Sequence, residues 1–339
     1  MKFLVIGLGS MGKRRIRNLR YLKAGEIIGF DLREDRCKET EKKYGIKTFK
    51  IFKEAILENP DIFIISTPPD EHIKYALIAV KSNKHFFTEV GLSTEGMDEL
   101  ITLCKEKSIV AAASCSMRFH PAVQIIKKLV EKKEIGKVLA FTHHCGHYLA
   151  NWHTYEDYRH FYVGKRETGG ARDMVPFELD WITWILGEIK IVSCMKDKLT
   201  NLDVDIDDTY SLLVSLENKI LGSILIDVIC KFPYRVIKLI GEEGVIIWDQ
   251  SKRYMEIFTS YDKKWRKEPV EEGTIEKGYV TGEKMYIEEM NHFIKAIKGE
   301  EKWMRSFTDE KKMLEILHKA EKSSGKKIHI QLGVNHEKV

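Results

Sequence analysis

The sequence lacks the features that mark secreted, disulfide-linked or membrane-spanning proteins. Its six cysteines are scattered and include no C-x-x-C pair, which is typical of reduced thiols in a cytoplasmic protein. No apolar run approaches the length of a membrane span, and the first run, residues 3–6, is too short for a signal peptide. We therefore expect a cytoplasmic protein with no membrane partner.

A large excess of one charge is also missing. The net charge is +5, from 56 basic and 51 acidic residues. One basic cluster comprises Lys13, Arg14, Arg15, Arg17 and Arg20, which taken alone suggests nucleic-acid binding. Because the rest of the chain is not basic, we interpret the cluster as a solvated helix face near a diphosphate, and we expect no nucleic-acid partner.

The N-terminal residues follow the layout of a dinucleotide-binding fingerprint. An apolar run over residues 2–6 is followed by helical spacing of apolar residues over 13–22, and a second apolar run ends in Asp31. In between lies the turn Gly7-Leu8-Gly9-Ser10-Met11-Gly12. Gly7 permits the tight turn, Gly9 lets the backbone approach a pyrophosphate, and Gly12 lets the helix pack closely on the strand. The free N–H groups at the helix start then face the phosphates.

Asp31 indicates which dinucleotide binds. It lies 19 residues after Gly12 (31 − 12), where a carboxylate accepts the ribose hydroxyls and repels a 2′-phosphate. NAD is therefore the expected cofactor. NADP stays open as the alternative, because Arg33 can either stack on adenine or pair with a 2′-phosphate.

The length of 339 residues predicts two domains, over residues 1–120 and 121–339. Apolar runs over residues 61–65, 85–88 and 109–113 alternate with helical segments, which predicts an α/β Rossmann domain with a doubly wound parallel sheet. Extended runs in series between helices predict an α+β second domain with an open, mostly antiparallel sheet. Its last helix can pack back on the first domain. The uncovered face of such a sheet favours a homodimer or homotetramer.

These segments together resemble the glucose–fructose oxidoreductase / inositol dehydrogenase / rhizopine-catabolism (Gfo/Idh/MocA) family over nearly the whole chain. The resemblance depends on the glycine turn and on several later runs, which are residues 66–72, 118–121, 134–137, 169–173, 241–244 and 288–296. It implies an NAD-dependent oxidoreductase that moves hydride between nicotinamide and a hydroxyl-bearing carbon of a sugar or nucleotide sugar. Residues 146–153 and 156–159 resemble a branch linked to bacterial surface-sugar pathways. By resemblance, the cofactor also contacts Ser66, Thr67, Pro68, His72, Glu89 and Arg118.

The sequence departs from the family at two positions that usually carry catalysis. The usual Glu-Lys-Pro motif is Glu89-Val90-Gly91 here, so valine replaces the lysine that polarises the substrate oxygen. The usual Asp-x-Gly-x-His motif matches residues 173–177, so Phe177 replaces the histidine that carries the proton. Of the usual catalytic groups only Asp173 remains. Another residue is therefore expected to help transfer the proton.

Three other residues are candidates for that catalytic role. Arg172 can polarise a carbonyl oxygen or pair with an anionic group, or it can form a structural pair with Asp173. His153 and Tyr148 belong to the loop that, by the family pattern, leads towards the substrate, and either can transfer a proton. Two rival functions remain open: a non-catalytic NAD(H)-binding sensor or scaffold, and a redox-neutral NAD-using lyase or hydrolase.

Histidines and a cysteine between residues 143 and 147 suggest a metal site. On a strand, His143, Cys145 and His147 would share one face and resemble a zinc site. No fourth ligand is evident, and nicotinamide-dependent chemistry of this kind needs no metal. We therefore expect none.

Overall fold

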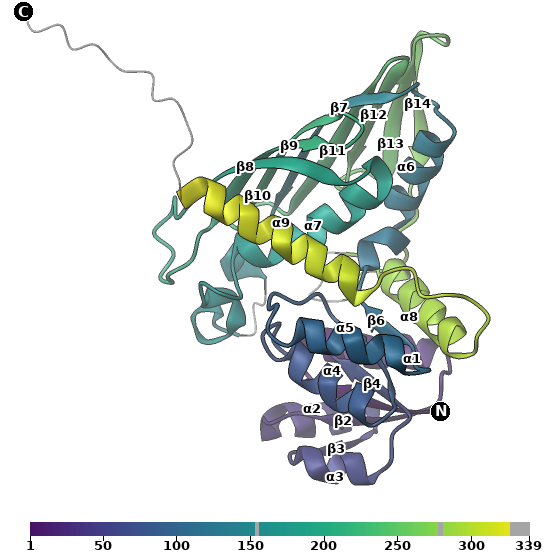
Figure 1. The fold of residues 1–339 in the computed structure, drawn as a ribbon, viewed down its shortest axis with the longest axis vertical. Helices are drawn as coiled ribbons and strands as arrows, with labels where there is room; N and C mark the ends of the chain where they lie inside the picture. Colours follow the sequence, from purple (N-terminus) through teal and green to yellow (C-terminus); the bar gives the residue numbers. More distant parts are fainter. Residues whose placement is uncertain (153–155, 277–280, 326–339) are drawn as a thin grey trace, which may run out of the picture.

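The computed structural model describes residues 1–152, 156–276 and 281–325. Its first part alternates strands and helices along the chain (Figure 1). These elements are β1 (Lys2–Ile6), α1 (Ser10–Tyr21), β2 (Glu26–Phe30), α2 (Glu34–Tyr44), β3 (Lys47–Phe49), α3 (Phe52–Leu57), β4 (Ile62–Ile65), α4 (His72–Lys81), β5 (His85–Thr88), α5 (Met97–Glu106) and β6 (Ala111–Ala113).

The strands of this part form a parallel sheet in the order β3-β2-β1-β4-β5-β6, which confirms the predicted doubly wound domain. Buried apolar side chains fill β1 and β4, as expected of strands covered on both faces. Ladder hydrogen bonds continue just past the strand ends: Gly7 donates to Phe30, Ser66 to Ile6 and Glu89 to Ile65. The carboxyl ends of β1, β2, β4 and β5 therefore meet at one edge of the sheet.

The second part contains a larger sheet and the remaining helices. Its elements are α6 (Pro121–Glu131), β7 (Val138–Gly146), α7 (Ala171–Leu186), β8 (Ile189–Asp197), β9 (Thr209–Leu216), β10 (Leu221–Asp227), β11 (Tyr234–Gly241), β12 (Gly244–Asp249), β13 (Tyr254–Thr259), β14 (Lys264–Pro269), α8 (Lys284–Ile297) and α9 (Phe307–Gly325). Short 3₁₀ helices occupy Ser116–Phe119, Leu149–Asn151, Tyr158–His160 and Tyr162–Gly164. In the described residues the sheet order is β14-β13-β12-β11-β7-β10-β9-β8. The prediction of a mostly antiparallel sheet is confirmed, with one parallel pair, β7 and β10.

The two faces of the second sheet differ. Helices α7 and α9 run across one face and bury side chains such as Leu212 and Ile224 (Figure 1). Leu213 and Leu221 alternate with these residues and are 62% and 61% exposed. The face opposite the helices thus carries apolar side chains that nothing in the described chain covers.

The end of the chain returns to the first domain. Helix α8 packs on α1, and its Met290, Phe293 and Ile294 join the core beneath β1. Helix α9 contacts α5 and β6 as well as β8 and α7. The two sheets are therefore tied together by the last two helices. Among the described residues, no helix combines the length and apolar character that crossing a membrane requires.

The interpretation of the basic cluster on α1 as a solvated face is wrong for Arg14 and Arg15, whereas Arg20 is exposed. Arg15 is fully buried and Arg14 is 3% exposed. Arg15 pairs with Glu289 at 2.8 Å, and Arg14 pairs with Glu283 at 3.0 Å. A buried guanidinium needs such partners, and these come from or immediately precede α8, more than 260 residues away in the chain.

Candidate active site

One groove of about 600 Å³ runs between the two domains. Gly9, Ser10 and Met11 of the first domain line it, and so do Asp173, Phe177 and Arg235 of the second. Its floor comes from the meeting strand ends of the first sheet, through Ser66, Thr67, Pro68 and Glu89, and His72 also lines it. A groove at the carboxyl ends of parallel strands is where doubly wound folds bind their ligands.

The glycine turn has the geometry of a pyrophosphate cradle. Gly7 has a φ of 89°, and a Cβ there would lie 2.5 Å from the Ser66 carbonyl oxygen. A Cβ on Gly12 would lie 1.8 Å from the Gly7 carbonyl oxygen, so both positions require glycine. At Gly9 a Cβ would meet only the Arg36 guanidinium, at 3.4 Å. Helix α1 starts here without a side-chain cap, so the chain leaves open space and backbone donors for a diphosphate.

Asp31 lies at the end of β2 beside this turn and is 7% exposed. Its Oδ2 accepts the Leu8 N–H at 2.7 Å, and its Oδ1 accepts the Arg33 N–H at 2.9 Å. These bonds orient the carboxylate, and each oxygen retains a lone pair for a ribose hydroxyl. The residues present thus fit the adenosine half of NAD.

Hydrogen bonds hold both ends of the segment Glu89-Val90-Gly91, in which the resembling family usually has a lysine at the position of Val90. Arg15 donates to both carboxylate oxygens of Glu89, at 2.6 and 2.8 Å, and the Gly91 N–H donates to Glu310 at 2.7 Å. Val90 between them lines the groove. The position therefore presents an apolar side chain to the groove, with no cation to polarise a substrate oxygen.

Asp173 is the acidic residue in the first turn of α7, and it lines the groove. Burial raises the pKa of its carboxyl to about 7, although the Arg172 charge and a hydrogen bond from the Tyr162 hydroxyl both act to lower it. Phe177 lies one turn later and also lines the groove. A carboxyl with a pKa near neutrality can both accept and release a proton at physiological pH.

The wall of the groove that the second domain provides contains a buried ionic cluster around Glu178. Arg235 donates to Glu178 at 2.7 Å and to Gln250 at 2.8 Å. Glu178 also accepts from Trp181 at 2.8 Å and pairs with His143 at 3.0 Å. Burial opposes ionisation of Glu178, but Arg235 and His143 outweigh it and hold the pKa of this carboxyl below its usual value. Glu178 is therefore ionised, and its ion pairs hold this wall of the groove in place.

Several residues singled out from the sequence lie elsewhere. Arg172 pairs with Glu321 at 2.6 Å, and Tyr148 packs beneath the Lys231 ammonium, so neither is among the described residues that line the groove. Arg118 makes a two-pronged contact with Asp180, at 2.7 and 2.9 Å, and is also away from the lining. His153 lies outside the described residues.

The possible zinc ligands do not converge. His143 uses one ring nitrogen on Glu178 and the other on the Val236 carbonyl oxygen. Cys145 is buried on the same face of β7, whereas His147 follows the end of the strand. Within the described residues no group of three His, Cys, Asp or Glu side chains is arranged to hold a metal.

The sequence did not single out several of the residues that line the groove. They include Arg36, Tyr162, Glu178, Arg235 and Gln250. Arg36 had a local signal, because it lies three residues after Arg33 and one helical turn brings the two side chains to the same side. Arg235 and Gln250 had none, since Arg235 reaches Glu178 from β11 of the second sheet and Gln250, just after β12, contacts Arg235.

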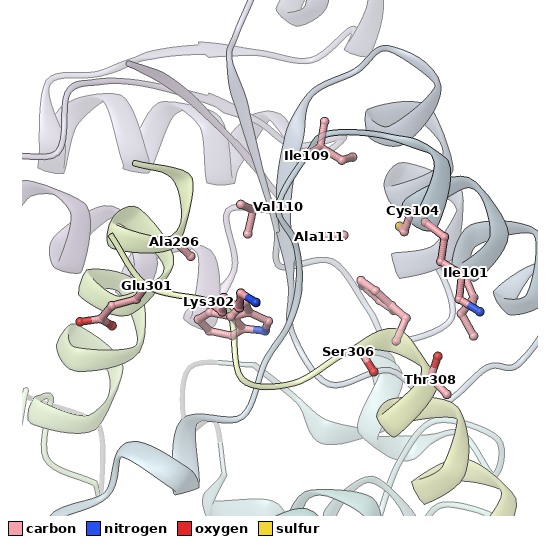
Figure 2. Close-up of a pocket in the computed structure, with 13 residues that line it drawn as sticks. Ile101, Cys104, Ile109, Val110, Ala111, Ala296, Glu301, Lys302, Ser306 and Thr308 are labelled. Carbon is pink, nitrogen blue, oxygen red and sulfur yellow. The ribbon is translucent and has the colours of Figure 1, made fainter. Parts of the chain in front are cut away.

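A second, smaller pocket of about 420 Å³ lies at the β6 edge of the first sheet (Figure 2). Its wall is mainly apolar and includes Ile101, Val110 and Trp303. Trp303 donates to the Ala113 carbonyl oxygen at 3.2 Å, so the tryptophan covers the open edge of the sheet. The pocket lies away from the glycine turn, and we assign it no ligand.

Comparison with known proteins agrees with this geometry. Residues 1–114 match the model of an oxidoreductase family with an NAD-binding Rossmann fold, and residues 123–247 match that of a GFO/IDH/MocA C-terminal domain. Myo-inositol 2-dehydrogenase of Thermotoga maritima is 25% identical over 98% of both chains. Levoglucosan dehydrogenase of Pseudarthrobacter phenanthrenivorans is 24% identical over 63% of this chain and 62% of its own length. UDP-N-acetylglucosamine 3-dehydrogenase of Acidithiobacillus ferrooxidans is 30% identical over 38% of this chain and 41% of its own.

A solved levoglucosan dehydrogenase in complex with NADH is similar in fold. It superimposes with a TM-score of 0.85 over 96% of this chain and 97% of that one, at 19% identity. At this identity the likeness shows the fold.

Proposed function

The chain belongs to the Gfo/Idh/MocA family of NAD-binding oxidoreductases, and from that premise we propose that it oxidises or reduces a sugar or nucleotide sugar with Asp173 as the proton carrier. NAD, when bound, supplies the hydride acceptor or donor. The observation that carries the proposal is one groove lined both by the glycine turn and by Asp173, whose burial raises the pKa of its carboxyl to about 7.

The proposed mechanism assigns distinct tasks to the side chains of the groove. Gly9 and the start of α1 hold the diphosphate, and Asp31 holds the ribose. Asp173 accepts the substrate hydroxyl proton during oxidation and returns it during reduction, while the Tyr162 hydroxyl orients its carboxylate. Val90 and Phe177 keep the surroundings apolar, which favours the protonated form of Asp173 in the absence of substrate.

Stopped-flow spectroscopy tests this proposal. Purified protein is mixed with NAD and a panel of sugars, nucleotide sugars and cyclitols, and NADH absorbance is followed within a single turnover. We expect reduction of NAD with at least one class of compound. No absorbance change with any of them, in a protein that binds NAD, would contradict redox activity.

A second function is favoured by the apolar residues at the two usual catalytic positions. Val90 and Phe177 are what a non-catalytic NAD(H)-binding sensor would tolerate. That function predicts tight NAD(H) binding without turnover. Mass spectrometry of the same mixtures detects a redox-neutral lyase or hydrolase reaction, because such a reaction would yield product without net NADH.

We also propose that the exposed face of the second sheet packs against a second copy of the chain, giving a homodimer or homotetramer. The support is a set of exposed apolar side chains on β8, β9 and β10, namely Ile191, Met195, Leu213, Leu221 and Leu225. Exposed apolar patches of this kind are typical of subunit interfaces. Sedimentation equilibrium measures the state directly, and a monomer at micromolar concentration would contradict the proposal.

A reducing, cytoplasmic location is part of the same proposal. All six cysteines are in the described residues and carry free thiols. The paired and buried arginines Arg14 and Arg15 also support the expectation of no nucleic-acid partner, because they offer no exposed basic surface.

A further inference from the structure

A carboxylate from the second domain reaches the part of the groove that Arg33 and Arg36 line. Glu156 Oε1 accepts from the Arg33 guanidinium at 2.6 Å and from the Arg36 guanidinium at 2.8 Å. Its Oε2 also accepts from Arg36, at 3.1 Å. Arg33 immediately precedes α2 and Arg36 is in its first turn. Glu156 therefore joins two arginines that lie 120 or more residues earlier in the chain.

Arg36 lies between the two parts of the dinucleotide site. Its guanidinium is 3.8 Å from Asp31 Oδ2, and it is the group that a Cβ on Gly9 would meet at 3.4 Å. Arg33, Arg36 and Glu156 all line the groove. In doubly wound folds an arginine beside the end of this strand is what accommodates the 2′-phosphate of NADP. The chain thus carries two such guanidinium groups next to a carboxylate typical of NAD-binding proteins.

Both guanidinium groups already have anionic partners. Arg33 divides its donors between Glu156 and Asp35, the latter at 2.5 and 3.1 Å. Arg36 gives its Nη2 donor to Glu156. Partial burial opposes ionisation of Glu156, but Arg36 and Arg33 outweigh it and hold the pKa of the carboxyl below its usual value. A 2′-phosphate, with a charge of about −1.5 to −2, would have to displace this carboxylate and approach Asp31 and Asp35 as well.

We propose that Glu156 is a specificity-determining residue that excludes NADP by withholding Arg33 and Arg36 from a 2′-phosphate. The inference rests on the dinucleotide binding within the proposed function and is independent of the sugar. Asp31 alone discriminates by repulsion, whereas Glu156 removes the attraction that would otherwise offset it. Without Glu156, the two arginines become a phosphate-binding pair.

The test is a measurement of nucleotide affinity without any sugar. Glu156→Gln keeps the side-chain size and removes its charge. Glu34→Gln is the matched control, because it removes the same charge from the first turn of α2, where Glu34 pairs with Lys38 and Lys50. Dissociation constants for NAD⁺ and NADP⁺ are measured by isothermal titration calorimetry. We expect Glu156→Gln to lower the ratio Kd(NADP⁺)/Kd(NAD⁺) about tenfold, as one or two freed charge-assisted hydrogen bonds would, and Glu34→Gln to change it by less than about threefold.

A double variant identifies the responsible group. Adding Arg36→Gln to Glu156→Gln should reverse most of the decrease in the ratio Kd(NADP⁺)/Kd(NAD⁺). A ratio unchanged in Glu156→Gln, or shifted no more than in Glu34→Gln, would overturn the inference. If the melting temperature shows that Glu156→Gln is damaged, Glu156→Ala replaces it, because alanine also removes the carboxylate. A native-like Glu156→Ala protein with a lowered ratio supports the inference, and one with no shift contradicts it.

The same binding measurements distinguish a failure of the proposed function from a failure of the Glu156 inference. If the original protein binds neither nucleotide, the proposed function itself is wrong. If it binds NAD⁺ and the ratio does not respond to Glu156, only the specificity inference is wrong.

Discussion

Replacement of Asp173 by asparagine tests the group on which the proposed chemistry depends. Burial raises the pKa of this carboxyl from 3.8 to about 7, against the opposing effects of Arg172 and Tyr162. At about 1.36 kcal/mol per unit, ionisation in the folded protein costs up to about 4 kcal/mol more than in the unfolded chain. Because the side chain lies at the groove, where water enters, we expect roughly half of that cost to be realised.

The sign of the effect on stability follows from proton linkage. Between about pH 4 and pH 7 the folded protein retains a proton that the unfolded chain has released, so the free energy of unfolding falls as pH rises. Asparagine does not ionise and removes this loss. The free energy of unfolding of Asp173→Asn minus that of the original protein should therefore be about 1 to 2 kcal/mol larger at pH 8 than at pH 5. Urea unfolding at the two pH values measures it.

The same substitution should abolish proton transfer while leaving cofactor binding intact. Asp173 must be ionised to accept a proton, so kcat for sugar oxidation should rise with pH through an inflection near 7. Asp173→Asn should reduce kcat by about 10² to 10⁴, with an unchanged Kd for NAD. Tyr162→Phe removes a hydrogen bond that lowers the Asp173 pKa, so it should move the inflection to higher pH. A kcat within tenfold of the original, or a profile without an inflection between pH 6 and 8, would refute Asp173 as the proton carrier.

Three further substitutions test the cradle, the buried cluster and the exposed sheet. Gly9→Asp should fold normally but lose NAD binding, measured by calorimetry, because the new side chain fills the space for the diphosphate. Gly12→Ala should fail to fold normally, as measured by circular dichroism, because its Cβ would lie 1.8 Å from a backbone oxygen. Glu178→Ala should lower the free energy of unfolding by about 3 to 5 kcal/mol in urea, because Arg235 is left buried without its partner; a loss below about 1 kcal/mol would contradict this. Leu213→Glu should convert the proposed oligomer to monomers by sedimentation equilibrium, and an unchanged mass would exclude this face as the interface.

The dinucleotide cradle could be predicted from the sequence because its requirements are local. Gly7 and Gly12 are needed for backbone reasons that hold within a few residues, and Asp31 follows at the end of the next strand. Apolar runs and helical spacing likewise predicted both sheets, since they reflect which faces of each element are buried. These signals are carried by neighbouring residues in the chain.

The identity of the catalytic candidates was harder to predict. Arg172 was a candidate because it precedes Asp173, and Tyr148 because of the family pattern, yet Arg172 pairs with Glu321 and Tyr148 packs under Lys231. The direction in which a side chain points depends on which partner lies nearby in space. For these residues the partners come from distant segments, and no local pattern reveals them.

The sequence by itself determined the glycine turn, the acid that follows it and the alternation of strands and helices, because backbone sterics and hydrophobic periodicity act over short stretches. Only the tertiary structure decided that Arg15 is buried against Glu89, that Glu156 lies against Arg36, and that Asp173 has a pKa near neutrality. Charge pairing and desolvation depend on distances of a few ångströms between segments far apart in the chain, and folding alone sets those distances.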